Sequence, residues 1–309
     1  MHIVITGGTG LIGRALIDYL LPARHDITVL SRRPERAALP DDVTVVGWDG
    51  VSAEGWAHVV DGADAVINLA GESIAGAGAL PARWTPARKR RILESRLNAT
   101  NAVATAIARA RNKPRMLVQG SAVGYYGAQR DDTPLDETAP PGRDFLADVV
   151  TQWEAASATV EAMGVRRAIA RTGLVLSAEG GSLPPMLLPF KLFLGGPLGD
   201  GRQWLPWIHI RDEVRALAFL MTEPRASGPF NLVAPNPVTN RDFASIAGRV
   251  LRRPAFLSAP APILRLALGE MATLLLDGQR ALPRRLLDLG FRFDFPELEP
   301  ALRDLLLRK

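Results

Sequence analysis

The chain opens with HIVIT at His2–Thr6, a short apolar run rich in β-branched residues, and GGTGLIG follows directly at Gly7–Gly13. The apolar run predicts a buried β-strand. Glycines recur at every third position of the second segment, and an apolar helical pattern starts at Leu11. A strand, a glycine turn and a helix in this order are the context in which such a motif binds a dinucleotide.

Each glycine of this motif has its own physical reason. Gly7 allows a tight turn, Gly10 lets the backbone approach a pyrophosphate, and Gly13 lets the helix pack closely on the strand. The free N–H groups and positive dipole end of the helix attract the phosphates. The predicted phosphate-binding residues are Gly7, Thr9, Gly10, Leu11, Ile12 and Gly13. A glycine-rich turn without a ligand is the alternative.

The composition narrows the classes of protein and site. The chain has 309 residues with 47% hydrophobic content, enough for one large domain or one domain with a smaller lobe. It has no cysteine, which excludes disulfides, thiolate metal sites and cysteine nucleophiles. Its four histidines are scattered without metal-ligand spacing, so we expect no metal site. The net charge of +5 suits an anionic cofactor.

Two segments could suggest binding to a nucleic acid or to a membrane. The basic run Arg88–Arg91 stands at the start of a long helical pattern, without aromatic platforms or a nucleic-acid motif, so a solvated helix face is expected. The apolar stretch Ala261–Leu276 is broken by Arg265 and Glu270 and is too short and too charged to span a membrane. Because the N-terminus already reads as a core strand, we expect no signal peptide and a cytoplasmic protein.

Predicted strands and helices alternate through the first half of the chain. The further strands are Asp26–Leu30, Val43–Gly47, Asp64–Leu69, Arg115–Gly120 and Arg167–Arg171, with Phe230–Val233 later. Helical patterns lie between most of them, notably Lys89–Arg111 and Phe145–Met163. The alternation predicts an α/β fold with a mostly parallel sheet covered on both faces. Ligands of such sheets bind beyond the carboxyl ends of the strands.

The residues after the second and third strands bear on the cofactor. Ser31, Arg32 and Arg33 follow the second strand, where an acidic residue would bind a ribose 2′-hydroxyl and arginine pairs with a 2′-phosphate. We therefore predict NADP(H), with ordinary surface arginines as the alternative. Asp49 follows the third strand and either accepts from the adenine amino group or closes an Asx turn with Gly50.

Small residues follow the fourth strand and let the backbone pass close to a cofactor. Further cofactor candidates are Asn68, Leu69, Ala70, Glu72 and Arg83, together with Thr172 after the sixth strand. The loop Gly71–Pro86 is longer than most such connections, which favours a functional role. In it, Arg83 is a candidate to bind a phosphate and Trp84 to line a substrate pocket.

Hydroxyl groups follow the fifth strand. Ser121 is a candidate hydrogen-bond donor to a substrate oxygen, and Tyr125 or Tyr126 is a candidate to orient the substrate or act as an acid. For each tyrosine the alternative is a wall residue with a satisfied hydroxyl, which we favour for at least one of them.

The later part of the sequence is predicted to form a smaller lobe. The segment Gly180–Gly201 is rich in proline and glycine and reads as a lid or substrate lobe. Pro189 and the Gly195–Pro197 break prevent it from forming one regular helix.

A cluster of polar and aromatic residues follows this segment. Trp207 and His209 are substrate-binding candidates, although a histidine between two isoleucines is more often structural. Asp212 is predicted to cap a helix beginning at Glu213.

Several blocks resemble one known family in order and spacing. They are GGTGLIG, NLAGE followed by RW, SAVGYYG, WEAA, RTGLVL, LGGPLGDG, PWIHIRD and NLVAP. Together they resemble the atypical extended short-chain dehydrogenase/reductases, and within them the epimerase-family subgroup of NAD-dependent epimerase/dehydratase-like and "cell-division inhibitor"-like proteins.

The resemblance implies a Rossmann-type doubly wound parallel sheet with a small C-terminal substrate-binding lobe. The NADP-binding domain would cover residues 1–176, completed by about 207–236, and the lobe would cover 177–206 and 237–309. It also implies bound NADP(H) and allows a homodimer formed through two long helices.

One departure from the family concerns its catalytic Tyr-x-x-x-Lys, in which the lysine lowers the pKa of the tyrosine. No such spacing occurs in this sequence. If Glu154 matches the acidic residue of the family's helix, Leu146 stands at the tyrosine position and Val150 at the lysine position. Ser121 matches the family's catalytic-site serine to within one residue.

Three functions follow as expectations. The first is an NADP(H)-dependent oxidoreductase acting on a small carbonyl or hydroxyl compound, with Tyr125 or Tyr126 replacing the missing phenol. The second is a non-catalytic regulatory protein that binds NADP(H). The third is a nucleotide-sugar epimerase, which needs the same missing phenol.

Overall fold

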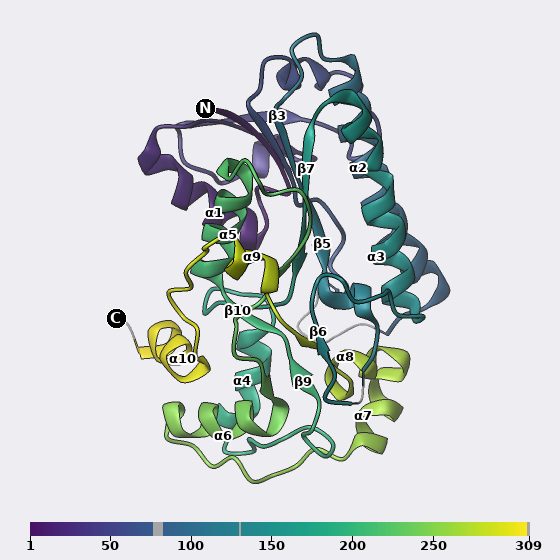
Figure 1. Ribbon diagram of the computed structural model, residues 1–309. Helices are drawn as coiled ribbons and strands as arrows, with labels where there is room; N and C mark the ends of the chain where they lie inside the picture. The colour runs from purple at the N-terminus through teal and green to yellow at the C-terminus, as the bar shows by residue number, and fades with distance from the viewer. Residues whose placement is uncertain (77–82, 130, 308–309) are drawn as a thin grey trace.

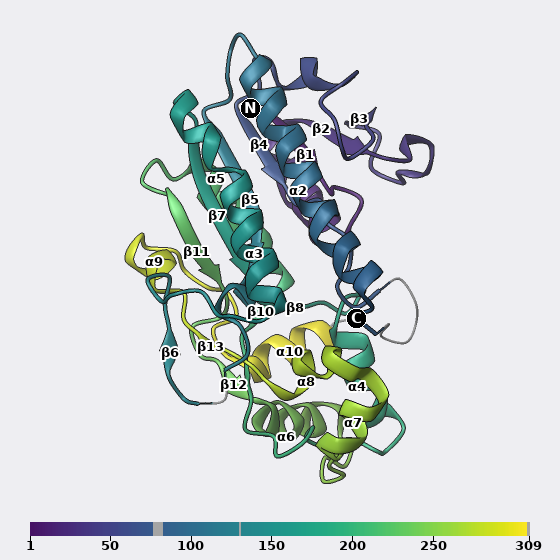
Figure 2. The same ribbon diagram turned by 90° about the vertical axis from the view of Figure 1, so that its right-hand side faces the viewer.

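The central feature of the molecule is one parallel β-sheet. The computed structural model describes residues 1–76, 83–129 and 131–307. The strands of the sheet are β1 (His2–Thr6), β2 (Asp26–Ser31), β3 (Val43–Gly47), β4 (Ala65–Asn68), β5 (Met116–Ala122), β7 (Arg166–Thr172) and β11 (Gly228–Leu232). Their spatial order is β11-β7-β5-β4-β1-β2-β3, as labelled in Figure 2 beside the view of Figure 1, and every neighbouring pair is parallel. The predicted Rossmann-type doubly wound sheet is confirmed, and the strand order reverses between β1 and β4.

Helices cover both faces of this sheet. Successive strand residues point to opposite faces, so Ile3 and Ile5 pack on one side and Val4 on the other. The first face is covered by α1 (Leu11–Leu20) and α5 (Ile210–Thr222). The second is covered by α2 (Pro86–Arg109) and α3 (Phe145–Ala156), which run side by side in Figure 2. Both faces are buried, which explains the nearly continuous apolar strands.

A smaller lobe lies beyond the carboxyl ends of the strands (Figures 1 and 2). Its helices are α4 (Leu183–Lys191), α6 (Asn240–Leu251), α7 (Ala261–Leu268), α8 (Thr273–Leu276) and α10 (Leu298–Leu307). Short strand pairs join it to the sheet domain: β8 (Leu174–Leu176) with β10 (Trp207–His209), β9 (Trp204–Leu205) with β12 (Val238–Thr239), and β6 (Pro134–Leu135) with β13 (Arg280–Ala281). The lobe has its own apolar core, which includes Leu187, Trp207 and Phe243.

The remaining short elements surround these two parts. Helix α9 (Arg284–Asp288) packs against β11. The 3-10 helices are η1 (Leu21–Ala23), η2 (Pro34–Arg36), η3 (Ala57–Val60), η4 (Val123–Tyr126), η5 (Ala158–Met163) and η6 (Gly269–Ala272). In the described ranges no helix is both long and apolar enough to cross a membrane.

Two helices differ from the sequence prediction. The predicted helix Phe145–Met163 ends at Ala156 and continues only as η5. Helix α4 runs through Pro189 and ends at Lys191, so the predicted break at this proline is wrong, although Gly180–Gly201 is not one helix. Pro189 has no N–H to donate, so it removes one backbone hydrogen bond of this nine-residue helix without ending it.

The start of α5 corrects another prediction. The helix begins at Ile210 and its N-cap is His209, whose ring accepts from the backbone N–H of Arg211, so Asp212 is not the cap. Asp212 is instead fully buried and accepts from the backbone N–H groups of Asp294 and Phe295, both at 2.8 Å. Its carboxylate therefore anchors the C-terminal segment to α5.

Candidate functional site

The glycine loop between β1 and α1 is shaped by close backbone contacts. Gly7 has φ +70°, and a Cβ there would lie 2.8 Å from the carbonyl group of Leu69. A Cβ on Gly13 would lie 2.4 Å from the carbonyl oxygen of Gly7. A Cβ on Gly10 would meet a single atom, the carbonyl oxygen of Gly7 at 3.3 Å, and Gly10 is exposed. Gly7 and Gly13 are thus needed because a side chain would clash with the backbone. Gly10 leaves an exposed backbone surface of the kind a pyrophosphate needs.

The N-terminus of α1 is free to receive a phosphate. Gly10 is its N-cap, with no side-chain cap and no acidic residue in the first turn. The first N–H groups of a helix have no intrahelical partner, and here they belong to Leu11, Ile12 and Gly13. Thr9 is exposed beside them. The predicted phosphate-binding residues therefore lie together, at the point where the strand order reverses.

An arginine-rich corner adjoins this loop. Arg32 and Arg33 are exposed directly after β2, and the backbone N–H of Arg33 donates to the Ser31 hydroxyl at 3.2 Å. Arg14 donates to the carbonyl of Thr9 at 3.0 Å and to the carbonyl of Ala38, linking the glycine loop to the loop after β2. Sequence reasoning missed Arg14, although its place directly after the third glycine was a usable signal.

Asp49 closes a turn. Its carboxylate accepts from the backbone N–H groups of Val51 and Ser52 at 2.7 and 2.8 Å and from the Ser52 hydroxyl. These hydrogen bonds, the Ser52 N–H foremost, hold the pKa of Asp49 below its usual value. The Asx-turn alternative is confirmed, and the adenine contact stays a prediction.

Asn68 has an internal role that the sequence did not suggest. As the last residue of β4 it is fully buried, and its amide accepts from the Thr6 hydroxyl at 2.6 Å. It also donates to Thr100 and Gln119 at 3.1 and 3.0 Å. Its side chain is therefore occupied, and the prediction that it binds the cofactor is wrong for that side chain. Leu69 and Ala70, next along the chain, are partly exposed.

The loop after β4 is held by the basic start of α2. Ser95 accepts from the backbone N–H of Glu72 at 3.0 Å, and the Glu72 carboxylate pairs with Arg91 at 3.5 Å. Arg88 is buried and donates to the carbonyl of Ser73 at 2.9 Å. The expectation of a wholly solvated basic face is thus wrong at Arg88, because this arginine supports the loop.

Arg83 and Trp84 connect this loop to the lobe. The Arg83 guanidinium donates to the carbonyls of Ala267 (2.9 Å) and Leu266 at the end of α7, so it does not face the glycine loop. Trp84 is buried, with its ring 5.2 Å from that of Phe145. Residues 77–82 of the long loop lie outside the described residues.

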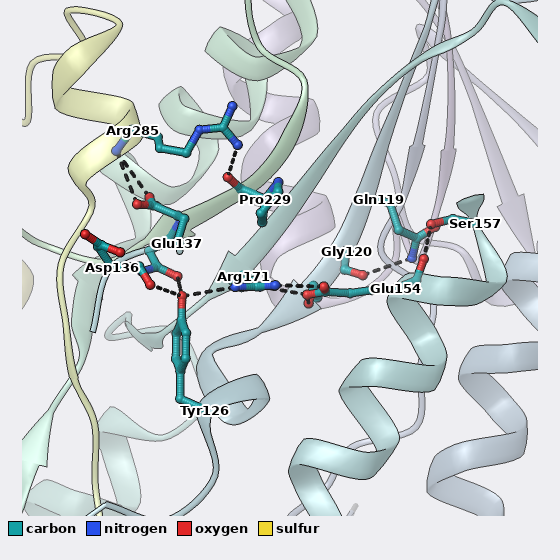
Figure 3. A network of polar contacts seen from close by, with 12 residues as sticks. Gln119, Gly120, Tyr126, Asp136, Glu137, Glu154, Ser157, Arg171, Pro229 and Arg285 are labelled. Carbon is teal, nitrogen blue, oxygen red and sulfur yellow. Dashed lines mark hydrogen bonds and ion pairs between the residues drawn. The ribbon is translucent and has the colours of Figure 1, made fainter. Parts of the chain in front are cut away.

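A buried polar network occupies the ends of β5 and β7. The structure extends β5 through Ala122, so Ser121 is a strand residue in register with Arg171. Its hydroxyl donates to Glu154 at 2.6 Å, and Arg171 donates to both oxygens of the same carboxylate at 2.8 and 2.9 Å. Figure 3 shows the Arg171–Glu154 pair. The prediction that Ser121 follows the strand and offers its hydroxyl to a substrate is therefore wrong.

The two neighbouring tyrosines differ. Tyr126 is fully buried; its hydroxyl accepts from Arg171 (3.1 Å) and donates to Asn231 (2.8 Å), and burial raises its pKa to about 12. This satisfied hydroxyl matches the alternative given for one tyrosine. Tyr125 is half-buried, and its ring centroid lies 3.4 Å from the Arg171 guanidinium carbon. In the described ranges its hydroxyl has no hydrogen-bond partner.

Apolar side chains stand where the resemblance places an acid–base pair. A Cβ on Gly124 would lie 3.5 Å from Leu146 Cβ and 3.8 Å from Val150 Cγ2, so both residues face η4. A cavity of about 60 Å³ lies beside them, between the sheet domain and the lobe, and Asp144, Leu146 and Gln279 are among its lining residues.

Trp207 and His209 are interior residues. Trp207 is 1% exposed and donates to the carbonyl of Asn236 at 3.2 Å. His209 is 2% exposed, stacks on Phe295 at 3.9 Å and lies 3.4 Å from the Asp304 carboxylate. Burial lowers the pKa of His209 to about 4. The structural alternative for His209 is thus the one observed, and both side chains are buried.

Thr172 ends β7 beside a buried acid that the sequence did not single out. Its hydroxyl donates to Glu213 at 2.8 Å. Glu213 is fully buried on α5, its second oxygen has no partner, and burial raises its pKa to about 8. In the described ranges no three His, Asp or Glu side chains are grouped to hold a metal ion.

The doubly wound sheet and its open glycine loop define a Rossmann-type protein with a nucleotide-binding loop. The model of the "NAD dependent epimerase/dehydratase family" matches residues 3–233, and a "Domain of unknown function (DUF1731)" matches residues 259–305. The chain belongs to the NAD-dependent epimerase/dehydratase family.

Individual relatives agree with this assignment. The chain is 41% identical to the epimerase family protein YfhF of Bacillus subtilis over 99% of this chain and 98% of that protein. Human epimerase family protein SDR39U1, solved with NADPH, superposes with a TM-score of 0.88 at 36% identity, covering 100% of both chains. A nucleoside-diphosphate sugar epimerase from Corynebacterium glutamicum gives 0.78 at 33% identity, covering 99% of this chain and 58% of that one.

Proposed function

We propose that this chain binds NADP(H) at the glycine loop and acts as an oxidoreductase on a small carbonyl or hydroxyl compound. The observation that carries the proposal is the open face of Gly10 at the uncapped N-terminus of α1. The presence of Arg32 and Arg33, with no acidic residue directly after β2, favours a 2′-phosphate over a free 2′-hydroxyl. The NADPH bound by the human relative supports the same choice.

NADPH, when bound, supplies a hydride for a carbonyl carbon. The chain must then orient the carbonyl group and provide a proton to its oxygen. Tyr125 suits this role, because its hydroxyl is unpartnered in the described ranges and its ring is held against Arg171 just beyond β5. Tyr126 does not suit it, because its hydroxyl already bonds within the buried network.

A second candidate is a non-catalytic protein that binds NADP(H) as a regulatory ligand. It is favoured by Leu146 and Val150, which leave no acid–base pair on α3. A nucleotide-sugar epimerase ranks third, despite the names of the relatives, because epimerisation needs the same proton transfers. We rank the oxidoreductase first because dinucleotide sites on this fold usually serve hydride transfer.

Thermal melting with NADP⁺, NADPH, NAD⁺ and NADH tests the cofactor. A ligand at a hundredfold excess over Kd stabilises the native state by about 2.7 kcal/mol, which gives a clear rise in Tm. We expect that rise with NADP(H), and we expect the paired Arg32→Ala and Arg33→Ala substitutions to remove it. No rise with any of the four dinucleotides would refute the proposal.

NADPH oxidation across a panel of carbonyl compounds then separates the first two candidates. Turnover that falls in Tyr125→Phe supports the oxidoreductase. NADPH binding without any turnover supports the regulatory protein.

A further inference from the structure

Arg96 is a half-buried arginine of α2 that lies against the loop after β4. Its Nη1 donates to the carbonyls of Glu72 at 3.0 Å and Ile92 at 2.9 Å. Its guanidinium carbon lies 5.0 Å from the ring of Trp153 on α3. A Cβ on Gly71 would lie 3.3 Å from its Cγ and Cζ. These contacts fix the guanidinium between two helices and the segment that leaves β4.

This position is close to the end of β5. The ring of Trp153 that stacks with Arg96 also lies 3.4 Å from a Cβ placed on Gly120. Gly120 is a residue of β5, the strand that leads to Tyr125. The guanidinium of Arg96 is therefore one indole ring away from the strand whose end carries the proposed proton donor.

In the described part of the chain Arg96 forms no direct ion pair, although the nearby Glu72 carboxylate favours its charge. That carboxylate, on the loop after β4, forms its direct ion pair with Arg91. Burial lowers the pKa of Arg96 to about 10, because the nearby Glu72 carboxylate only partly offsets the loss of hydration. A desolvated cation that shares its counter-charge with another arginine is unfavourable, and an anionic ligand would relieve that cost.

The free edge of Arg96 has a defined shape. Nη1 uses both of its N–H groups on the two carbonyls, so Nε and Nη2 remain. In the described ranges, the side-chain polar atoms that are fully buried and lack a hydrogen-bond partner belong to Arg88, His209, Glu213 and Arg280. Nε and Nη2 of Arg96 are not among them. The two nitrogens therefore face space that solvent reaches. Side by side they present two parallel N–H groups, the arrangement that binds a carboxylate through both oxygens.

We propose that Arg96 binds a carboxylate of the substrate, so that the substrate is a small carbonyl compound carrying a carboxylate, such as a 2-oxo acid. This rests on the proposed oxidoreductase and adds its substrate class. The Nε–Nη2 edge holds the carboxylate, and Tyr125 serves the carbonyl group of the same molecule.

The experiment uses the full chain saturated with NADPH and measures the rise in Tm with pyruvate and 2-oxoglutarate. Pyruvamide is the matched uncharged probe. We expect at least one of the two acids to raise Tm while pyruvamide does not. Arg96→Gln should weaken binding of that acid about tenfold or more, since a lost hydrogen-bonded ion pair costs at least one decade of affinity. Arg90→Gln, an exposed arginine of the same helix, should bind like the wild type.

Other outcomes are distinguishable. If NADPH itself does not raise Tm, the cofactor proposal fails. If NADPH binds but neither acid stabilises the wild type, or Arg96→Gln retains the full effect, the carboxylate proposal is overturned. Arg96→Lys keeps the positive charge without the two-pronged edge and guards against misfolding of Arg96→Gln. We expect Arg96→Lys to have the circular dichroism spectrum of the wild type, which shows that it is folded, and still to lose most of the affinity for the acid.

Discussion

The Ser121 hydroxyl donates to Glu154 at 2.6 Å, and the same carboxylate receives two hydrogen bonds from Arg171 on the neighbouring strand. A hydroxyl expected to face a ligand is thus part of an interior ion-pair network. The network joins β5, β7 and α3 immediately beneath η4. It holds Tyr125 in place, because the ring of that tyrosine rests on Arg171.

Substitutions at Ser121 and Tyr125 distinguish a residue that stabilises the fold from one that takes part in the proposed reaction. Ser121→Ala should lower the free energy of unfolding by about 1.5–3 kcal/mol, since a hydrogen bond to a buried charged group is lost. It should leave NADPH binding unchanged. Tyr125→Phe should reduce turnover by about 10²–10⁴ while the unfolding free energy stays near the wild-type value. Urea unfolding and NADPH oxidation measure the two effects, and the reverse pattern would contradict the assignment.

The glycines of the loop should respond differently to alanine. Gly13→Ala places a Cβ 2.4 Å from the carbonyl oxygen of Gly7, so we expect a loss of about 1–3 kcal/mol of stability. Gly10→Ala meets only one atom at 3.3 Å and should fold normally, but its methyl group covers the open face. NADPH affinity should then fall about tenfold or more. Calorimetric titration gives the affinity, and wild-type binding by Gly10→Ala would argue against the pyrophosphate site.

The buried Glu213 predicts one pH dependence. Its folded pKa is about 8 against an ordinary value of 4.5, so the folded state holds a proton that the unfolded state releases. Stability from this group is therefore complete below pH 4.5 and is lost as pH rises towards 8, by roughly 1.4 kcal/mol per unit at most. Glu213→Gln keeps an acceptor for Thr172 and should abolish that slope. Parallel unfolding curves for both proteins at pH 5 and pH 8 would disprove it.

His209 predicts the opposite slope. Its folded pKa of about 4 lies below the ordinary 6.5, so the unfolded state takes up a proton first on acidification. Its contribution is complete above pH 6.5 and is lost as pH falls towards 4, by roughly 1.4 kcal/mol per unit at most. His209→Asn can still cap α5 and does not titrate there. The difference between the two proteins isolates this effect, and a constant difference from pH 7 to pH 4 would exclude it.

The sequence predicts the sheet and the glycine loop because period, spacing and turn chemistry are local properties. It is less reliable at strand ends. Strand β5 ends two residues later than predicted, so Ser121 is a strand residue whose side chain points inward. Asn68 is the last residue of β4, and its side chain also points inward. Alternate residues of a strand point to opposite faces, so the exact strand end decides which side chains are buried.

Other roles depend on tertiary position. His209 and Asp212 can both cap a helix, and the choice depends on which backbone groups the C-terminal segment brings to Asp212. Arg88 and Arg96 occupy ordinary helix positions, and only the path of the loop after β4 distinguishes them from surface arginines.

The hydrogen bonds from Arg83 to the end of α7 affect what can be expected of a truncated chain. The segment that leaves the cofactor's strand is fastened to a helix nearly two hundred residues later in the chain. Removing the lobe would therefore release that segment, whereas the close contacts of Gly7 and Gly13 lie within the sheet domain and would remain. The glycine loop and the loop after β4 thus depend on different parts of the chain, and a protein without the lobe should keep the shape of the first but not of the second.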